Sequence, residues 1–254
     1  MKQVSKTLVL IAVAMLISTA VIAQVPSFNV TAPFASSNMA TNLIRNSSKR
    51  VVRDRTRPSA QAGGLSALLD PGVSARGSIA DYRATSYKAD KSITRQVRSE
   101  FISRMSDAEP GSARQALAAY PELNIDRAYK EVTRSFGLSP NSFSDAMTAH
   151  MVLGWLIAND VADPPAGSVE AVRRQMAATI NESDGYKTDS ERQRLSEELK
   201  IMFVLAFSGW RDAVKNGGAS GRNSYADGVN QLWKTKFGRD LRDVKLTAQG
   251  FSEA

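Results

Sequence analysis

The chain has 254 residues, of which 43% are hydrophobic and 23% charged, and it carries a formal net charge of +8. This composition is typical of a globular protein with one or two domains. Cysteine is absent, which excludes disulfide bonds and lipid attachment at a bacterial lipoprotein cleavage site. The stability of the protein must therefore come from a hydrophobic core.

The positive charge is concentrated towards the N-terminus. Residues 1–23 carry +2 and residues 24–90 have nine basic and four acidic side chains, whereas residues 91–254 have 22 basic and 21 acidic side chains. A nucleic-acid-binding domain would need its basic residues on a structured face. The nearly neutral C-terminal part argues against specific nucleic-acid binding.

Residues 1–23 have the pattern of a cleavable signal peptide. Two lysines precede the apolar run Leu8–Ile17, and cleavage is expected between Ala23 and Gln24. A transmembrane anchor is the alternative, but the run is shorter than the ~20 residues of a membrane span, and so is every later apolar segment. We expect an exported, soluble protein, periplasmic or secreted, without a transmembrane span and not a lipoprotein.

Residues 24–90 show no sustained helical or strand period, and four prolines interrupt them. Such a segment cannot bury enough apolar surface to offset the entropy lost on ordering, so we expect a disordered arm. Its basic part would attract anionic phospholipid or another polyanion, with about 1 kcal/mol per basic residue near a charged membrane. A solvated tether or a protease-sensitive linker is the alternative. The basic residues in question are Arg45, Lys49, Arg50, Arg53, Arg55 and Arg57.

From residue 91 to residue 254, helix start signals agree with helical periodicity. Thr188 and Glu191 have the spacing of a capping box and open the longest expected helix, which ends at Gly217-Gly218. The only alternating segment, Asp243–Thr247, is too short to make a sheet. Further helices are expected to open at Ser92, Ser112, Ile125, Ser142, Ser168 and Ser224.

Two of the expected helices, at residues 142–160 and 188–216, are apolar on every side in their middle turns, which is typical of helices that others surround. The remaining helices have one apolar face and should pack around these two. The sequence therefore predicts an all-α fold. We expect a compact domain of six or seven helices over residues 91–254, preceded by the disordered arm.

Three segments resemble an uncharacterised family of bacterial exported helical proteins, a domain of unknown function. They are Tyr129–Trp155, Leu199–Ala206 and the ending Asp243–Phe251, of which the ending is the most specific. The resemblance covers about residues 112–251 and implies a bacterial envelope or secreted location and a helical fold. It brings no known activity, so it assigns no functional residue.

No catalytic or ligand-binding motif stands out. His150 is the only histidine and lies among apolar helix neighbours; because one histidine cannot form a histidine-based metal site, we expect it to be buried or half-buried. The segment Gly217–Arg222 lacks the preceding strand and the Gly-Lys-Ser/Thr ending of a phosphate-binding loop, so it should connect two helices. Residues 181–189 lack the ligand alternation of a calcium loop. We predict no metal and no cofactor.

Paired carboxylates are the feature that best fits an enzyme, because a glycosidase needs two of them. Any chain with 25 acidic residues contains such pairs, however, and most acidic residues are solvated or cap helices. The tryptophans lie on apolar helical faces, which favours core packing over a ligand-stacking platform. The pairs are Asp160/Asp163, Asp184/Asp189 and Glu197/Glu198, and the tryptophans are Trp155, Trp210 and Trp233.

These patterns favour a non-enzymatic exported helical module that binds a protein partner or, through the arm, an anionic envelope surface. A cell-envelope hydrolase that uses paired carboxylates is one alternative. A structural or assembly subunit is another, and a large exposed apolar patch would indicate it.

Overall fold

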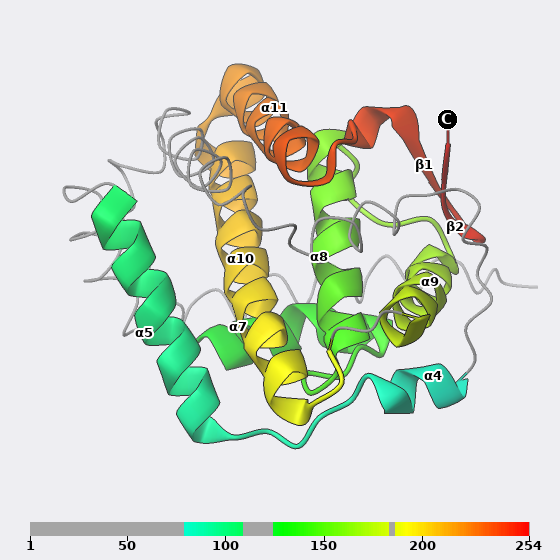
Figure 1. Ribbon diagram of the computed structural model, residues 1–254. Coiled ribbons are helices and arrows are strands. Elements are labelled where there is room, and N and C mark those ends of the chain that lie inside the picture. Colours follow the sequence, from blue (N-terminus) through cyan, green and yellow to red (C-terminus); the bar gives the residue numbers. More distant parts are fainter. Residues whose placement is uncertain (1–78, 109–123, 183–185, 254) are drawn as a thin grey trace, which may run out of the picture.

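The computed structural model describes residues 79–108, 124–182 and 186–253 and shows an almost entirely helical body (Figure 1). These ranges contain seven α-helices, two 3-10 turns and one two-stranded sheet, which confirms the predicted all-α class. No helix in them is both long enough and apolar enough to cross a membrane. The helices are α4 (Ile79–Ala84), α5 (Lys91–Ala108), α7 (Ile125–Thr133), α8 (Phe143–Ala158), α9 (Ser168–Glu182), α10 (Asp189–Asn216) and α11 (Gly218–Phe237), and the turns are η1 (Arg134–Phe136) and η2 (Leu241–Asp243).

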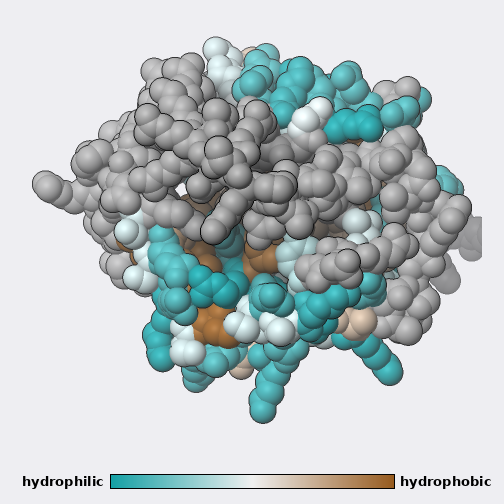
Figure 2. Space-filling view, in the orientation of Figure 1, coloured by the Kyte–Doolittle hydropathy of each residue, from teal (hydrophilic) through white to brown (hydrophobic). Residues whose placement is uncertain are grey.

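Helices α8 and α10 form the centre of the body, as predicted, and the others surround them (Figure 1). Of the 16 residues of α8, 14 are buried, because α9, α10 and α11 all pack against it. Where Figure 2 shows described residues, the face is largely hydrophilic, with a few small hydrophobic areas. Among the described residues, the exposed large hydrophobic side chains are Phe136 and Val214, which lie on η1 and α10.

Side-chain caps set the start of two central helices, as the sequence predicts. Thr188 Oγ1 accepts the backbone N–H of Glu191 at 3.2 Å, and the Glu191 carboxylate accepts the backbone N–H of Thr188 at 3.0 Å, which completes the capping box. At the start of α8, Ser142 Oγ accepts the backbone N–H of Asp145 at 3.3 Å. Ser168 differs: α9 begins at this residue, and its hydroxyl donates to the carbonyl of Pro165 at 2.6 Å.

Two of the expected elements differ in the structure. The last helix begins at Gly218 rather than at Ser224, since α11 follows α10 almost directly and has no side-chain cap that a sequence signal could reveal. The segment Asp243–Thr247 does make a sheet: its residues form β1 (Val244–Thr247), which pairs antiparallel with β2 (Gly250–Glu253). The helix expected at Ser112 lies outside the described residues.

The packed body begins at residue 79, inside the segment that was expected to be a disordered arm. Tyr82 lies under the guanidinium of Arg173, with 4.2 Å between Cζ and the ring centroid. Thr85 is buried among the serine hydroxyls at the start of α8. Both anchors, Tyr82 and Thr85, act through an aromatic ring or a hydroxyl rather than through a stripe of aliphatic side chains. Helical periodicity in the sequence therefore does not predict them. Residues 24–78 lie outside the described residues.

A buried ion pair joins α8 to α9 near the start of α8. The fully buried carboxylate of Asp145 accepts two hydrogen bonds from Arg173, at 2.7 and 2.8 Å, and one from the backbone N–H of Ser139 at 2.7 Å. Burial by itself lowers the pKa of Arg173, but the hydrogen bonds and charge of Asp145 outweigh burial and raise it. Losing one member would leave an uncompensated charge, which costs about 3–5 kcal/mol.

Helices α8 and α11 meet at Gly154, where α8 has no side chain. The indole of Trp233, which is 1% exposed, covers Gly154 so closely that a Cβ there would lie 2.5 Å from the indole Nε1. The same indole stacks on His150, with ring centroids 5.4 Å apart. Glycine at position 154 is therefore a requirement of this helix crossing.

Replacing Gly154 by alanine should destabilise the protein. Overpacking a core costs about 1–3 kcal/mol, and a 2.5 Å contact with a rigid ring belongs at the upper end, while helix propensity returns about 1 kcal/mol. We expect urea denaturation to show a net loss of about 2 kcal/mol. Gly221→Ala is the matched control: its Cβ would meet open space in α11, so it should stabilise by up to about 1 kcal/mol. Equal effects of the two variants would contradict the close crossing.

Candidate functional site

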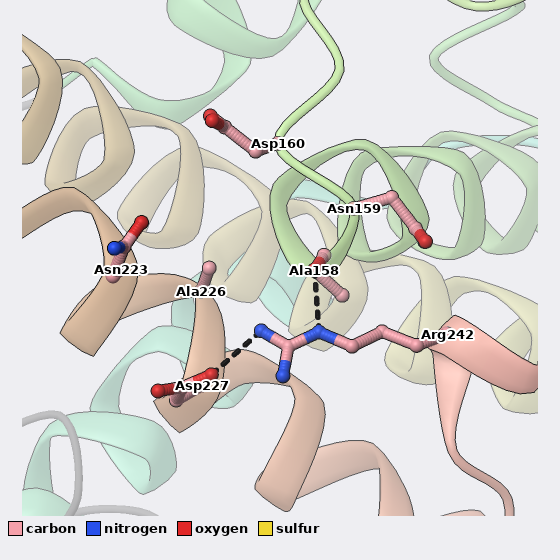
Figure 3. Close-up of a pocket in the computed structure, with 7 residues that line it drawn as sticks. All are labelled: Ala158, Asn159, Asp160, Asn223, Ala226, Asp227 and Arg242. Atoms are coloured by element: carbon pink, nitrogen blue, oxygen red, sulfur yellow. Dashed lines mark hydrogen bonds and ion pairs between the residues drawn. The ribbon is translucent and has the colours of Figure 1, made fainter. Parts of the chain in front are cut away.

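A pocket of about 460 Å³ opens where the C-terminal end of α8 meets α11 and η2 (Figure 3). This volume is within the range of small-molecule binding sites, about 300–1,000 Å³, but the pocket is open to solvent rather than an enclosed, mostly apolar cleft. Two small residues form its floor and five polar or charged residues line the rest. The lining consists of Ala158, Asn159, Asp160, Asn223, Ala226, Asp227 and Arg242.

The end of α8 places an acidic residue at the pocket. The backbone N–H of Val161 bonds to the carbonyl of Leu156 at 2.9 Å, and that of Asp160 to the carbonyl of Ile157 at 3.2 Å. This pair of bonds is a Schellman motif, whose left-handed residue is usually glycine. Here the left-handed residue is Asp160, with φ of 53°. A left-handed backbone favours glycine, so Asp160 keeps its carboxylate at a position where the backbone alone would favour a residue without a side chain.

Two arginines form ion pairs with the acidic residues of the pocket. Arg242 donates from Nε to the carbonyl of Ala158 at 2.9 Å and from Nη2 to Asp227 Oδ1 at 2.6 Å, so it ties η2 to the ends of both helices (Figure 3). Arg222 lies 3.3 Å from Asp160 Oδ2. All four of these charged side chains remain partly exposed to solvent.

Three polar groups in the pocket keep hydrogen-bonding capacity. Over the described ranges, no protein group bonds to Asp160 Oδ1, to Asp227 Oδ2 or to the side-chain amide of Asn223. The carbonyl end of α8 adds partial negative charge, because helix dipoles align along the axis. The pocket therefore presents unused acceptors in a concave, solvent-accessible place.

Comparison with known proteins identifies a family but no activity. A family model described as a family of unknown function, DUF6683, matches residues 4–253. The chain belongs to the DUF6683 family. No curated protein and no solved structure matches it. The match agrees with the resemblance to a family of unknown function and covers more of the chain than residues 112–251.

The candidate residues of the arm cannot be placed in this DUF6683 chain. Arg45, Lys49, Arg50, Arg53, Arg55 and Arg57 lie outside the described residues, as does Asp184.

The carboxylate pairs proposed from sequence do not form shared sites in the described ranges. Asp160 lines the pocket, but Asp163 is exposed and is not part of the lining. Glu197 is buried and lies 2.7 Å from Lys200, whereas Glu198 is half-buried. Asp189 is exposed and accepts the backbone N–H of Lys88. The pair that does share a pocket, Asp160 and Asp227, lies 67 residues apart in sequence.

The pair of Glu197 and Lys200 belongs to the core. Their side chains are 4% and 3% exposed. Burial by itself lowers the pKa of Lys200, but the neighbouring Tyr87 and Glu197 outweigh burial and raise it. Lys200 therefore stays protonated at neutral pH and is paired inside the helical body rather than offered to a ligand.

The other residues considered from the sequence, His150 and the tryptophans, pack within or against the core. His150 is buried, as expected. Trp233 lies in the core, while Trp155 and Trp210 are half-buried against it, and Trp155 donates to the carbonyl of Val244 at 2.7 Å. The expected connector Gly217–Arg222 is shorter than predicted: only Gly217 lies between α10 and α11, and Gly218–Arg222 form the start of α11. In the part of the chain that the structure describes, no three His, Cys, Asp or Glu side chains gather to hold a metal ion.

Sequence reasoning missed four polar pocket residues: Asn159, Asn223, Asp227 and Arg242. They come from the end of α8, from α11 and from η2 and share no motif, so only the folded chain brings them together. The fifth polar residue, Asp160, was named from sequence only as a member of the pair Asp160/Asp163. Its left-handed backbone becomes visible only in the structure.

Replacing Asp160 by glycine tests whether the backbone carries a cost at this position. A non-glycine residue in the left-handed region costs about 1–2 kcal/mol, whereas an exposed ion pair contributes only about 0–1 kcal/mol. Asp160→Gly should therefore raise the free energy of unfolding by up to about 1 kcal/mol in urea denaturation. A loss of more than about 1 kcal/mol would mean that the carboxylate is needed for folding.

Proposed function

We propose that this protein is an exported, non-enzymatic binding module of the bacterial cell envelope, and that the pocket between α8 and α11 is its ligand site. The observation that supports this is a pocket of about 460 Å³ whose lining includes Asp160, Asn223 and Asp227, each with a polar atom that no described residue hydrogen-bonds. The signal-peptide pattern of residues 1–23 supports export. The ligand would be a small polar molecule or a polar segment of a partner protein.

The left-handed Asp160 is consistent with a binding role. Backbone strain at a residue that glycine could occupy without cost is a frequent feature of ligand sites. The ion pairs with Arg222 and Arg242 keep both carboxylates fixed without using all of their oxygens. A pre-organised acceptor loses less conformational entropy on binding than a mobile one.

A ligand screen with a blocked pocket tests the proposal. The mature chain (residues 24–254) would be titrated with amino acids, amino sugars, neutral disaccharides and dicarboxylates while its melting temperature is measured. We expect at least one class to raise the melting temperature of the wild type, because a ligand stabilises the state that binds it.

The blocking variant is Asn223→Trp, which fills the pocket from an exposed helical position. It should abolish the shift. Ser220→Trp, on an exposed position one turn earlier in α11 and outside the lining, should leave the shift unchanged. No shift with any class, or the same shift in the blocked variant, would overturn the pocket as the site.

A hydrolase is the rival function, and the shared pocket of Asp160 and Asp227 is the observation that favours it. Two carboxylates flanking a bond are the machinery of glycoside hydrolysis. Release of soluble fragments from purified peptidoglycan, lost in Asp227→Asn, would replace the binding proposal. If the peptidoglycan stays intact, the hydrolase function is excluded for this substrate.

Binding to an anionic envelope surface through the arm is a second candidate function. The supporting observation is that residues 45–57 carry six basic side chains and one acid. Replacing all six basic residues by glutamine should abolish most association with phosphatidylglycerol vesicles at low salt, and added salt should weaken the wild type, since screening acts on exposed charges.

A control variant removes six exposed basic residues of the folded body that form no ion pair with any residue the structure describes. It should retain the association, and equal loss in both variants would mean that net charge alone governs binding. The control changes Arg83, Lys88, Lys91, Arg95, Lys130 and Lys245 to glutamine.

Export has its own test. Expression with the native leader in a bacterial host should yield protein outside the cytoplasm whose N-terminal residue is Gln24, because Ala23 satisfies the preference for a small residue before the cleavage site. N-terminal sequencing of the fractionated protein measures this. Cytoplasmic protein that retains Met1 would contradict the export proposal.

A further inference from the structure

The junction between α10 and α11 contains the only Asn-Gly sequence of the chain. Asn216 is the last residue of α10, and Gly217 lies between the two helices. Both residues are exposed, and Gly218, which follows them, has a left-handed backbone with φ of 57°. The ends of helices have the fewest internal hydrogen bonds and open most readily. Solvent and local opening can therefore both reach this junction.

An asparagine side chain that precedes glycine can react with its own backbone. The nitrogen of Gly217 attacks Asn216 Cγ and gives up its proton to a base, a new C–N bond closes a succinimide ring, and the side-chain nitrogen leaves as ammonia. Water then opens the ring at either carbonyl, which leaves aspartate or isoaspartate. Water is the only co-reactant, and glycine has no Cβ to hinder the attack.

The folded junction keeps the reacting atoms apart. Side chains in a helix tilt towards its N-terminus, and Asn216 Nδ2 accordingly donates to Asp212 Oδ1 at 2.6 Å. The nucleophile is engaged as well, because the backbone N–H of Gly217 donates to the carbonyl of Ala213 at 3.0 Å. Ring closure must break both hydrogen bonds. Opening of the last turn of α10 should therefore set the rate of the reaction.

We propose that Asn216 is a site of spontaneous deamidation, and that opening of the last turn of α10 controls it. The product replaces a hydrogen-bond donor to Asp212 by a second carboxylate, at the helix end where the dipole disfavours negative charge. Isoaspartate also adds a methylene to the main chain between two helices that pack against each other. The reaction is thus a one-way change that loosens α11, and it does not depend on the proposed binding function.

The rate comparison tests the site. The purified protein would be stored at mildly alkaline pH, folded or in urea, and peptide mass spectrometry would measure loss of the amide and formation of isoaspartate. In the folded protein we expect Asn216 to react about tenfold faster than Asn223, an exposed asparagine inside α11 that precedes serine. Urea should accelerate the reaction at Asn216 by about tenfold or more, because unfolding breaks both protecting hydrogen bonds.

Charge variants test the consequence. Asn216→Gln should abolish the modification, since a longer side chain closes the ring far less readily. Asn216→Asp has the charge of the product and should lower the melting temperature by about 1–4 °C. Ser220→Asp is the matched control: it adds the same charge at an exposed position in the first turn of α11, where the dipole favours it, and should not lower the melting temperature.

Three results would overturn the inference. An unmodified Asn216 in the folded protein, after a time in which the chain in urea reacts fully, would remove the site. Equal rates in the folded protein and in urea would exclude control by helix opening. An unchanged melting temperature in Asn216→Asp would remove the proposed effect on α11.

Discussion

The indole of Trp233 fills the space that a side chain at position 154 would need, so α8 and α11 can meet only across a glycine. This steric constraint decides where the ends of the two helices lie. Ala158 of α8 and Ala226 of α11 are buried beyond this crossing and line the pocket together with polar side chains.

The pocket is held by groups that act on the helix ends. Arg242 bonds to the last turn of α8 and to a side chain of α11, so a single guanidinium fixes η2, α8 and α11 relative to one another. The Schellman motif that ends α8 turns Asp160 to the same place. The central core and the buried pair of Asp145 and Arg173 keep α8 rigid beneath this end. A rigid scaffold that positions a few polar groups is the usual construction of a binding site.

The fold was largely predictable from sequence, and the pocket was not. Capping at Ser142 and Thr188 and the apolar middles of α8 and α10 are local signals, and the structure follows them. The signals failed where stability comes from distant partners: the anchors of α4 are Tyr82 and Thr85, which no periodicity reveals. The pocket brings together polar residues from the end of α8, from α11 and from η2. They share no sequence motif, so only the folded structure shows that they are neighbours.

A double-mutant cycle between Gly154 and Trp233, read by urea denaturation, tests the steric constraint most directly. If the indole is what a side chain at position 154 strikes, Gly154→Ala should cost about 2 kcal/mol in the wild type. Beside Trp233→Leu it should cost nothing or stabilise by up to about 1 kcal/mol through helix propensity, a coupling of about 2–3 kcal/mol. Additive costs, with Gly154→Ala equally harmful in both backgrounds, would contradict the account.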